Sequence, residues 1–188
     1  MHRYIYIKNL AYFAVAIVSF HYIYVWWSNN QFKPFKNEVD ILFINTGKIL
    51  FNQSDKLVHL LGISHTEIDN TFYFPKIIDK QEVSSFGNPF LEVSPGCTCL
   101  KQWLHWIFLM ILFPGPLKHK LWYIPAGVVV LHFVNVLRIT ILAIVLSHSS
   151  GYFHFFHDYL LKALFYGSIF IIWVLWVERV QHIQNQCP

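Results

Sequence analysis

The chain has 188 residues, of which 55% are hydrophobic and 19% aromatic, and its mean hydropathy is +0.43. This composition excludes an ordinary soluble domain and is typical of a protein that crosses a membrane several times. The formal net charge is +4. The basic residues form no patch of the kind that binds nucleic acid, so we expect a lipid bilayer as the surroundings and no nucleic-acid partner.

Four apolar segments are predicted to cross the bilayer, at about residues 10–27, 100–117, 121–146 and 159–177. The first has no charge, ends in the pair Trp26-Trp27 and lacks the small residues of a signal-peptide cleavage site. The second is short, because Pro114-Gly115-Pro116 stops its apolar run. The predicted fold class is an all-α integral membrane protein with about four transmembrane helices, forming a single membrane domain over 1–188.

The segment 28–96 contains scattered charges and several prolines, which indicates an aqueous or interfacial region. Within it, Val39–Phe51 is predicted to form a short helix lying on the membrane or capping the bundle. Thr71–Ile78 and Phe90–Val93 are β-prone, so a small hairpin is predicted to lead toward Cys97.

The predicted topology follows from the basic residues that flank the spans. Lysines or arginines occur in both terminal regions and in the turn at 114–120, whereas the loop at 147–157 has none. The positive-inside rule therefore places both termini and the 114–120 turn in the cytoplasm. The segment 28–96 is then extracytoplasmic, in a multi-pass protein of the inner (cytoplasmic) membrane.

Arg138 is the most informative single residue. It lies eight residues before Leu146, or roughly 12 Å below the outer end of its predicted helix. A charge at that depth costs about 3 kcal/mol, yet no Asp or Glu lies inside any predicted span. Either the side chain extends to the outer headgroups, or it meets a transient anion such as a thiolate or an oxyanion. Asn135 lies on the same helix face and is predicted to support it.

Two further groups are expected at the same outer face. Cys97 lies where a polar loop meets an apolar helix, and both a helix N-terminus and a nearby cation favour the nucleophilic thiolate. Cys99 is a rival that points about 200° away if the segment is helical. His157 is the predicted acid/base residue, with Asp158 either orienting it or capping the helix. His148 and His154 share its loop.

The chain has three cysteines, which are too few for a disulfide framework. Cys97 and Cys99 are two residues apart, a spacing at which an intrachain bridge is strained, and Cys187 lies near the end of the chain. We therefore expect free thiols, and the sequence predicts neither a cofactor nor a bound metal.

Three short motifs together resemble the exosortase/archaeosortase family, in which Cys-Ser/Thr-Gly, Asn-x-x-Arg and a His followed by an acid occur in that order. Here they are Cys97-Thr98, Asn135-Val136-Leu137-Arg138 and His157-Asp158. The resemblance covers roughly residues 93–175. Cys99 stands where the family usually has glycine, and four spans are fewer than many members have.

The resemblance implies a membrane-embedded cysteine transpeptidase with an extracytoplasmic active site. Such an enzyme cleaves a C-terminal sorting signal of membrane-anchored, exported proteins and passes the acyl group to an acceptor, with a surface glycan or a lipid as candidates. It implies Cys97 as the nucleophile, Arg138 as the oxyanion stabiliser and His157 as the acid/base residue.

Two other interpretations stay open at this stage. In one, the protein is a non-catalytic polytopic membrane subunit whose polar residues only join helices. In the other, His105 and His132 in the second and third predicted spans ligate a b-type haem, although their heights in the membrane match poorly.

Overall fold

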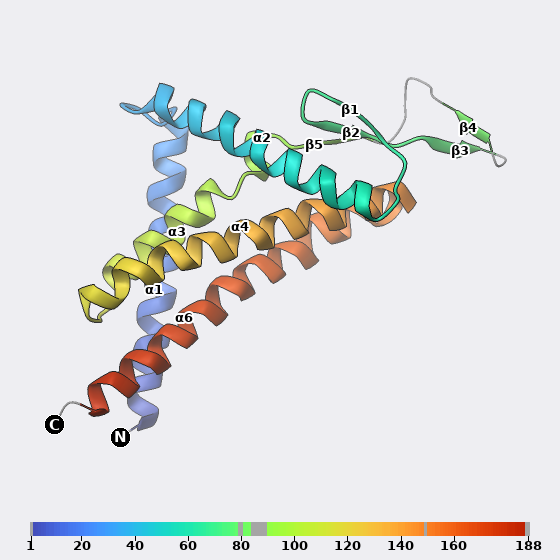
Figure 1. The fold of residues 1–188 in the computed structure, drawn as a ribbon. Helices are drawn as coiled ribbons and strands as arrows, with labels where there is room; N and C mark the ends of the chain where they lie inside the picture. The colour runs from blue at the N-terminus through green and yellow to red at the C-terminus, as the bar shows by residue number, and fades with distance from the viewer. Residues whose placement is uncertain (1, 79–80, 84–89, 149, 187–188) are drawn as a thin grey trace. The chain divides into compact units, whose positions relative to one another are not determined.

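The computed structural model describes residues 2–78, 81–83, 90–148 and 150–186, most of them helical (Figure 1). Cys187 lies outside the described residues. The α-helices are α1 (His2–Asn29), α2 (Lys36–Leu60), α3 (Leu100–Leu112), α4 (Leu117–His148), α5 (Phe153–Phe155) and α6 (Leu161–Gln186). Shorter helical turns are η1 (Pro95–Cys97), η2 (Ser150–Tyr152) and the π-helical η3 (Phe156–Leu160). The strands are β1 (Thr66–Ile68), β2 (Thr71–Tyr73), β3 (Lys76–Ile78), β4 (Gln81–Val83) and β5 (Phe90–Glu92).

Three helical segments in the described part of the chain are long and apolar enough to cross a bilayer: Asn9–Asn29, Leu117–His148 and Phe153–Arg179. They coincide with three of the four predicted spans, and the chain is a helical multi-pass membrane protein. The remaining predicted span, at about 100–117, corresponds to α3, which has only 13 residues. At 1.5 Å per residue α3 is about 20 Å long, less than a hydrocarbon core of about 30 Å. The predicted count of four spans is therefore not confirmed.

α3 ends where the sequence places Pro114, Gly115 and Pro116. A Cβ added to Gly115 would lie 2.7 Å from the indole of Trp176, so only glycine fits this turn. The ammonium group of buried Lys120 donates to the carbonyl oxygen of Phe113 at 2.5 Å and to that of Ile111 at 3.4 Å. These bonds satisfy carbonyls that the end of the helix leaves without intrahelical partners.

The fold divides into two compact units. Unit 1 contains residues 1–41, 100–131 and 169–188, and unit 2 contains residues 42–99 and 132–168. Helices α2, α4 and α6 each contribute a part to both. All five predicted site residues belong to unit 2. The single membrane domain over 1–188 and the extracytoplasmic placement of 28–96 both stay predictions.

Aromatic side chains hold unit 1 together. Phe20 on α1 packs on His105 of α3 with ring centroids 4.3 Å apart, and Phe13 packs on Trp173 of α6 at 4.5 Å. The indole nitrogen of fully buried Trp106 donates to the carbonyl oxygen of Ile124 at 3.1 Å. Aromatic pairs at these distances contribute about 0.5–1.5 kcal/mol each beyond the area they bury.

The core of unit 2 is a small antiparallel sheet against the second half of α2. Its strand order is β1-β2-β5 (Figure 1). Phe72 of β2 pairs with Leu91 of β5 in the antiparallel ladder. Phe72 is fully buried and lies 4.5 Å from the ring of Phe51 on α2. The predicted hairpin leading toward Cys97 thus corresponds to the β2–β5 pair. A second hairpin, β3–β4, is separate, and β1 was not predicted.

α2 is longer than the predicted helix over Val39–Phe51, because it has 25 residues and continues to Leu60. The polar stretch after Phe51 does not break it, since neither proline nor glycine occurs there. Ser54 and Val58 are fully buried, so this stretch keeps one face toward the core. The prediction of a short helix was therefore wrong at its C-terminal end.

Candidate active site

Cys97 ends a single 3-10 turn that the preceding residues build. Pro95 occupies the first turn of η1, where a missing N–H has no cost. The Cys97 N–H donates to the Ser94 carbonyl at 2.8 Å, and the Thr98 hydroxyl donates to the Pro95 carbonyl at 2.8 Å. α3 begins only at Leu100. Cys97 therefore lies in a turn before the helix and not at the helix N-terminus, contrary to the prediction that it opens that helix.

The two neighbouring cysteines have different surroundings. Cys97 is half-buried, and its sulfur accepts from the Ser94 hydroxyl at 3.7 Å and donates to the Glu92 carbonyl at 3.9 Å. Cys99 is fully buried, and burial raises the pKa of its thiol to about 12. Because the thiolate is the reactive form, Cys99 is held inert, whereas Cys97 is accessible.

Asn135 connects α4 to the cysteine turn. Its side-chain amide donates to the Cys97 carbonyl at 2.9 Å, and the residue is fully buried. Gly47 of α2 approaches the same turn closely, because an added Cβ would lie 3.7 Å from the Val93 carbonyl oxygen and 3.9 Å from the Thr98 side chain. The backbone at Cys97 is thus hydrogen-bonded to α4, and α2 lies beside the same turn.

Arg138 lies one helical turn after Asn135, on the same face of α4. The residue is only 8% exposed, so it is enclosed by protein. In the described part of the chain it makes no ion pair, and both its Nε and the Asn135 Oδ1 are buried without a hydrogen-bond partner. An enclosed cation and an amide oxygen with free bonding capacity therefore lie one turn apart beside the cysteine turn.

Two bonds fix this part of α4 to α2. The His132 Nε2 and the Gln53 Oε1 are 2.6 Å apart, and the Ser54 hydroxyl donates to the Val136 carbonyl at 3.5 Å. A helix tied at these two points presents Asn135 and Arg138 in a defined direction. That is what a preorganised electrostatic site requires.

His157 lies in the π-helical turn η3, a rare geometry that occurs frequently at functional sites. Its Nδ1 is 3.1 Å from Asp158 Oδ1, and the ring stacks on Phe153 with centroids 5.5 Å apart. Asp158 also accepts from the Lys162 ammonium at 2.9 Å. An Nδ1–H held by a carboxylate leaves Nε2 available for proton transfer.

The two rival histidines are placed less suitably. The side chain of His154 is 89% exposed and lies 3.7 Å from Asp158. The His148 Nδ1 lies 3.0 Å from the carbonyl oxygen of Ile144 in its own helix. Of the three, His157 alone combines a carboxylate at Nδ1 with partial burial.

The structure connects some of the predicted site residues directly, whereas His157 and Asp158 are bonded to each other and not to the rest in the described part of the chain. Asn135 is bonded to Cys97, and Arg138 follows on the same helix face. No hydrogen bond or ion pair among the described residues joins His157 to either of them. Two neighbours of the site were not predicted: Ser94 beside the thiol of Cys97, and Lys162 beside Asp158. The second could have been predicted, because residues four apart on a helix lie on the same face.

The two histidines of the haem interpretation have protein contacts at Nε2. His105 Nε2 is 3.3 Å from the Ile17 carbonyl oxygen, within unit 1. His132 Nε2 faces Gln53 in unit 2, as described above. A haem would have to displace both contacts, so the geometry does not favour it.

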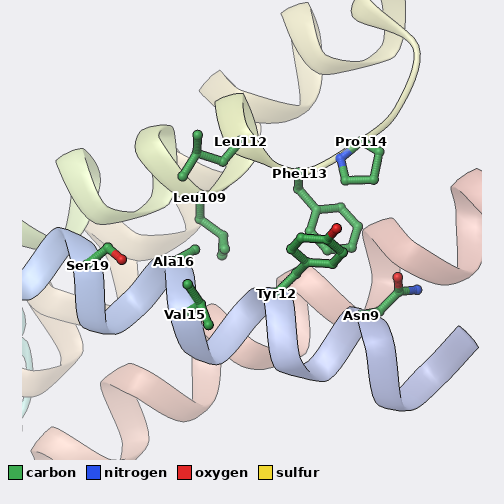
Figure 2. A pocket seen from close by; sticks show the side chains of 9 residues that line it. All are labelled: Asn9, Tyr12, Val15, Ala16, Ser19, Leu109, Leu112, Phe113 and Pro114. Atoms are coloured by element: carbon green, nitrogen blue, oxygen red, sulfur yellow. The ribbon is translucent and has the colours of Figure 1, made fainter. Parts of the chain in front are cut away.

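A groove of about 670 Å³ lies in unit 1, and its side chains come from α1, from the end of α3 and from Pro114 (Figure 2). The lining residues are Asn9, Tyr12, Val15, Ala16, Ser19, Leu109, Leu112, Phe113 and Pro114. They are mostly apolar and include neither a carboxylate, an imidazole nor a thiol. The groove therefore lacks the thiol and the imidazole that a cysteine transpeptidase needs.

Comparison with known proteins identifies the family. The family model described as transmembrane exosortase matches residues 9–175, well beyond the part that carries the three motifs. Neither the curated proteins nor the solved structures gave a match. The family match supports a membrane transpeptidase-like role and membrane-associated protein substrates. Because the match spans most of the sequence, the chain belongs to the transmembrane exosortase family.

Proposed function

We propose that this protein is a cysteine transpeptidase that cleaves a C-terminal sorting signal from membrane-anchored, exported proteins. The observation that carries the proposal is the junction between α4 and the cysteine turn. There the Asn135 amide holds the Cys97 carbonyl at 2.9 Å, one helical turn from a buried guanidinium without an ion-pair partner in the described residues.

In the first half-reaction, the Cys97 thiolate attacks the scissile carbonyl carbon. The C–S bond forms while the carbonyl π electrons move to oxygen, and the Arg138 guanidinium stabilises the resulting oxyanion. Collapse of the tetrahedral intermediate breaks the C–N bond. His157, protonated at Nε2, gives its proton to the leaving amine, and the product is an acyl thioester on Cys97.

In the second half-reaction, neutral His157 accepts a proton from the acceptor through Nε2. The acceptor attacks the thioester carbonyl, and the C–S bond breaks to regenerate the Cys97 thiolate. Asp158, at 3.1 Å from Nδ1, keeps the imidazole in the tautomer that both steps require. A surface glycan or a lipid supplies the attacking hydroxyl or amine.

The absence of an ion-pair partner for Arg138 among the described residues supports this assignment. A buried charge without a counterion is costly, so an enclosed arginine normally has a carboxylate beside it. The oxyanion of the tetrahedral intermediate would balance the charge of Arg138 during the reaction, so this arginine does not require a permanent carboxylate beside it. Of the two cysteines that the structure describes, the half-buried thiol of Cys97 is the better nucleophile, because burial keeps the thiol of Cys99 protonated.

The proposed location follows from the flanking charges. With both termini in the cytoplasm, Cys97 and His157 face the extracytoplasmic side of the inner membrane, where exported substrates arrive. The bilayer holds the substrate's own apolar segment close to the enzyme, and the two units then work as a single membrane domain.

The test compares two matched alanine variants. Cys97→Ala, Cys99→Ala and the unchanged protein are each expressed with an exported protein that carries a C-terminal motif, an apolar span and a basic tail from the same genome. Removal of the C-terminal segment is followed by the mass of the substrate. Detergent extraction and gel filtration establish that all three forms insert and fold.

We expect Cys97→Ala to abolish processing and Cys99→Ala to retain it, because only the first thiol is accessible. Normal processing by a folded Cys97→Ala protein would contradict the proposal and would favour a non-catalytic membrane subunit.

A further inference from the structure

One carboxylate and two imidazoles come together near the end of α2, in unit 2. Asp55 and His59 are four residues apart on this helix and therefore share a face. His65 follows the helix, and the ligand-capable atoms of all three residues lie within 4.8 Å of one another. The proposed acyl transfer uses none of them.

The chain turns back on itself to bring His65 into this cluster. Gly62 has a φ of +72°, a conformation that glycine adopts without strain. Its N–H donates to the His59 carbonyl at 3.0 Å, and the Ile63 N–H donates to the Val58 carbonyl at 3.3 Å. This pair of bonds is the Schellman motif that ends many helices. It returns the next residues toward the last turns of α2.

Aromatic packing then fixes the His65 ring. The side chain is only 1% exposed, and its ring centroid lies 5.3 Å from that of Phe72 and 5.0 Å from that of His59. The imidazole is therefore held in one orientation between the sheet and the helix. His59, in contrast, is exposed and has room to rotate.

The hydrogen-bond partners of His65 indicate which of its ring nitrogens carries hydrogen. Nδ1 lies 3.0 Å from the Ile63 carbonyl oxygen, which only accepts, so this nitrogen carries hydrogen. Nε2 lies 2.7 Å from Asp55 Oδ1, and an ionised carboxylate also only accepts. Nε2 and the carboxylate therefore need a cation between them, either a proton at this separation of 2.7 Å or a metal ion at a wider one. A histidine whose Nδ1–H is held by a backbone carbonyl is also the usual arrangement of a metal ligand.

We propose that Asp55, His59 and His65 bind one Zn²⁺ ion. Two imidazole nitrogens and one carboxylate oxygen form a donor set that zinc favours, with a water in the fourth tetrahedral position. At zinc–ligand bonds of about 2.0–2.1 Å the ligand atoms lie about 3.3 Å apart. His65 Nε2 and Asp55 Oδ1, at 2.7 Å, therefore have to move slightly apart when the ion binds, while the exposed His59 side chain rotates toward it.

The ion would tie the end of α2 to the chain that enters β1. That strand pairs with β2, and β2 pairs with β5, after which the chain passes into the turn of Cys97. The site thus fixes the sheet that precedes the nucleophile, and it does not depend on the transpeptidase assignment.

The test uses the full chain in detergent, purified through a tag without histidine. Zinc content after gel filtration is measured by elemental mass spectrometry, and the dissociation constant by competition with a chromogenic chelator. His59→Ala removes one ligand at an exposed position, and His59→Gln serves as a second variant of similar size. His21→Ala, an exposed histidine on α1, is the matched control.

We expect one zinc per chain in the unchanged protein and in His21→Ala, and at least tenfold weaker binding in both His59 variants. Thermal stability should fall on addition of a strong zinc chelator in the first two proteins only. Less than one zinc per chain at saturation, or equal affinity in the His59 variants, would overturn the proposal. A proton would then lie between Asp55 and His65, as a simple imidazolium–carboxylate pair.

Discussion

The buried thiol of Cys99 should resist alkylation under conditions in which the thiol of Cys97 reacts. Burial raises the pKa of Cys99 to about 12. At pH 8 its thiolate fraction is then about 10⁻⁴, against about one quarter for free cysteine with a pKa of about 8.5. Since the thiolate is the form that reacts, Cys99 should be alkylated about 10³-fold more slowly than free cysteine, before any steric protection is counted.

The pH dependence of the same reaction has a defined sign. The pKa of Cys99 lies above the ordinary range, so each unit of increase in pH between 8 and 11 should raise its thiolate fraction, and its labelling rate, about tenfold. The rate should level off only near pH 12.

The assay is a time course with iodoacetamide on the folded protein in detergent, followed by peptide mapping that separates Cys97 from Cys99. Free cysteine in the same buffer gives the reference rate, and labelling in denaturant gives the rate of the exposed chain. Equal labelling rates for the two residues in the folded protein at pH 8 would refute the reasoning, and with it the choice of Cys97 over Cys99.

Three further predictions concern single substitutions in the two units. Arg138→Gln should lower the rate of acyl transfer about 10²–10³-fold without loss of folded protein, as removal of an oxyanion donor does; an unchanged rate in a transfer assay would remove this role. Gly127→Ala should lower stability by about 1–3 kcal/mol through overpacking, because its Cβ would overlap the Trp106 indole, whereas Gly167→Ala, with nothing within 4 Å, should not; thermal melts compare the two, and equal melting temperatures would contradict the packing. Asp158→Asn should slow transfer by up to about 10⁴-fold through loss of the imidazole tautomer, and full activity of this variant would exclude the carboxylate as its orienting group.

The sequence predicts the membrane helices well where apolar runs are long and carry few charges. The spans at about 10–27, 121–146 and 159–177 all fall within long apolar helices. The stop at Pro114 was readable as well, because proline and glycine break helices locally. Whether α3 crosses the bilayer depends on its length against that of the hydrocarbon core, and 13 residues fall short of it.

Two features of the fold depend on tertiary packing and not on the local sequence pattern: the length of α2 and the formation of β1. α2 continues past Phe51 through polar residues because one face of that stretch, including Ser54 and Val58, is buried. β1 has three exposed residues and becomes a strand only by pairing with β2. Neither feature follows from periodicity, since both depend on partners that are distant in the sequence or that fold at the same time.

The candidate active site also has features that the sequence predicts and features that only the structure shows. The Asn135–Arg138 spacing gave their shared helix face, and the order of the motifs gave the family. The bond from Asn135 to the Cys97 carbonyl, and the turn that places Cys97 ahead of α3, needed three-dimensional information. The cluster of Asp55, His59 and His65 was also missed, because the four-residue spacing of two members is common and the third arrives only through the reversal at Gly62.

Mass spectrometry of the acyl-enzyme tests the central claim most directly. The folded protein is incubated with its substrate without an acceptor, quenched in acid and digested, and the peptide that contains Cys97 is measured with and without hydroxylamine. We expect a substrate-derived acyl group on Cys97 that hydroxylamine removes, and no acyl group on Cys99. Processing of the substrate with an acyl group on a different residue, or with no covalent adduct at any time point, would contradict it.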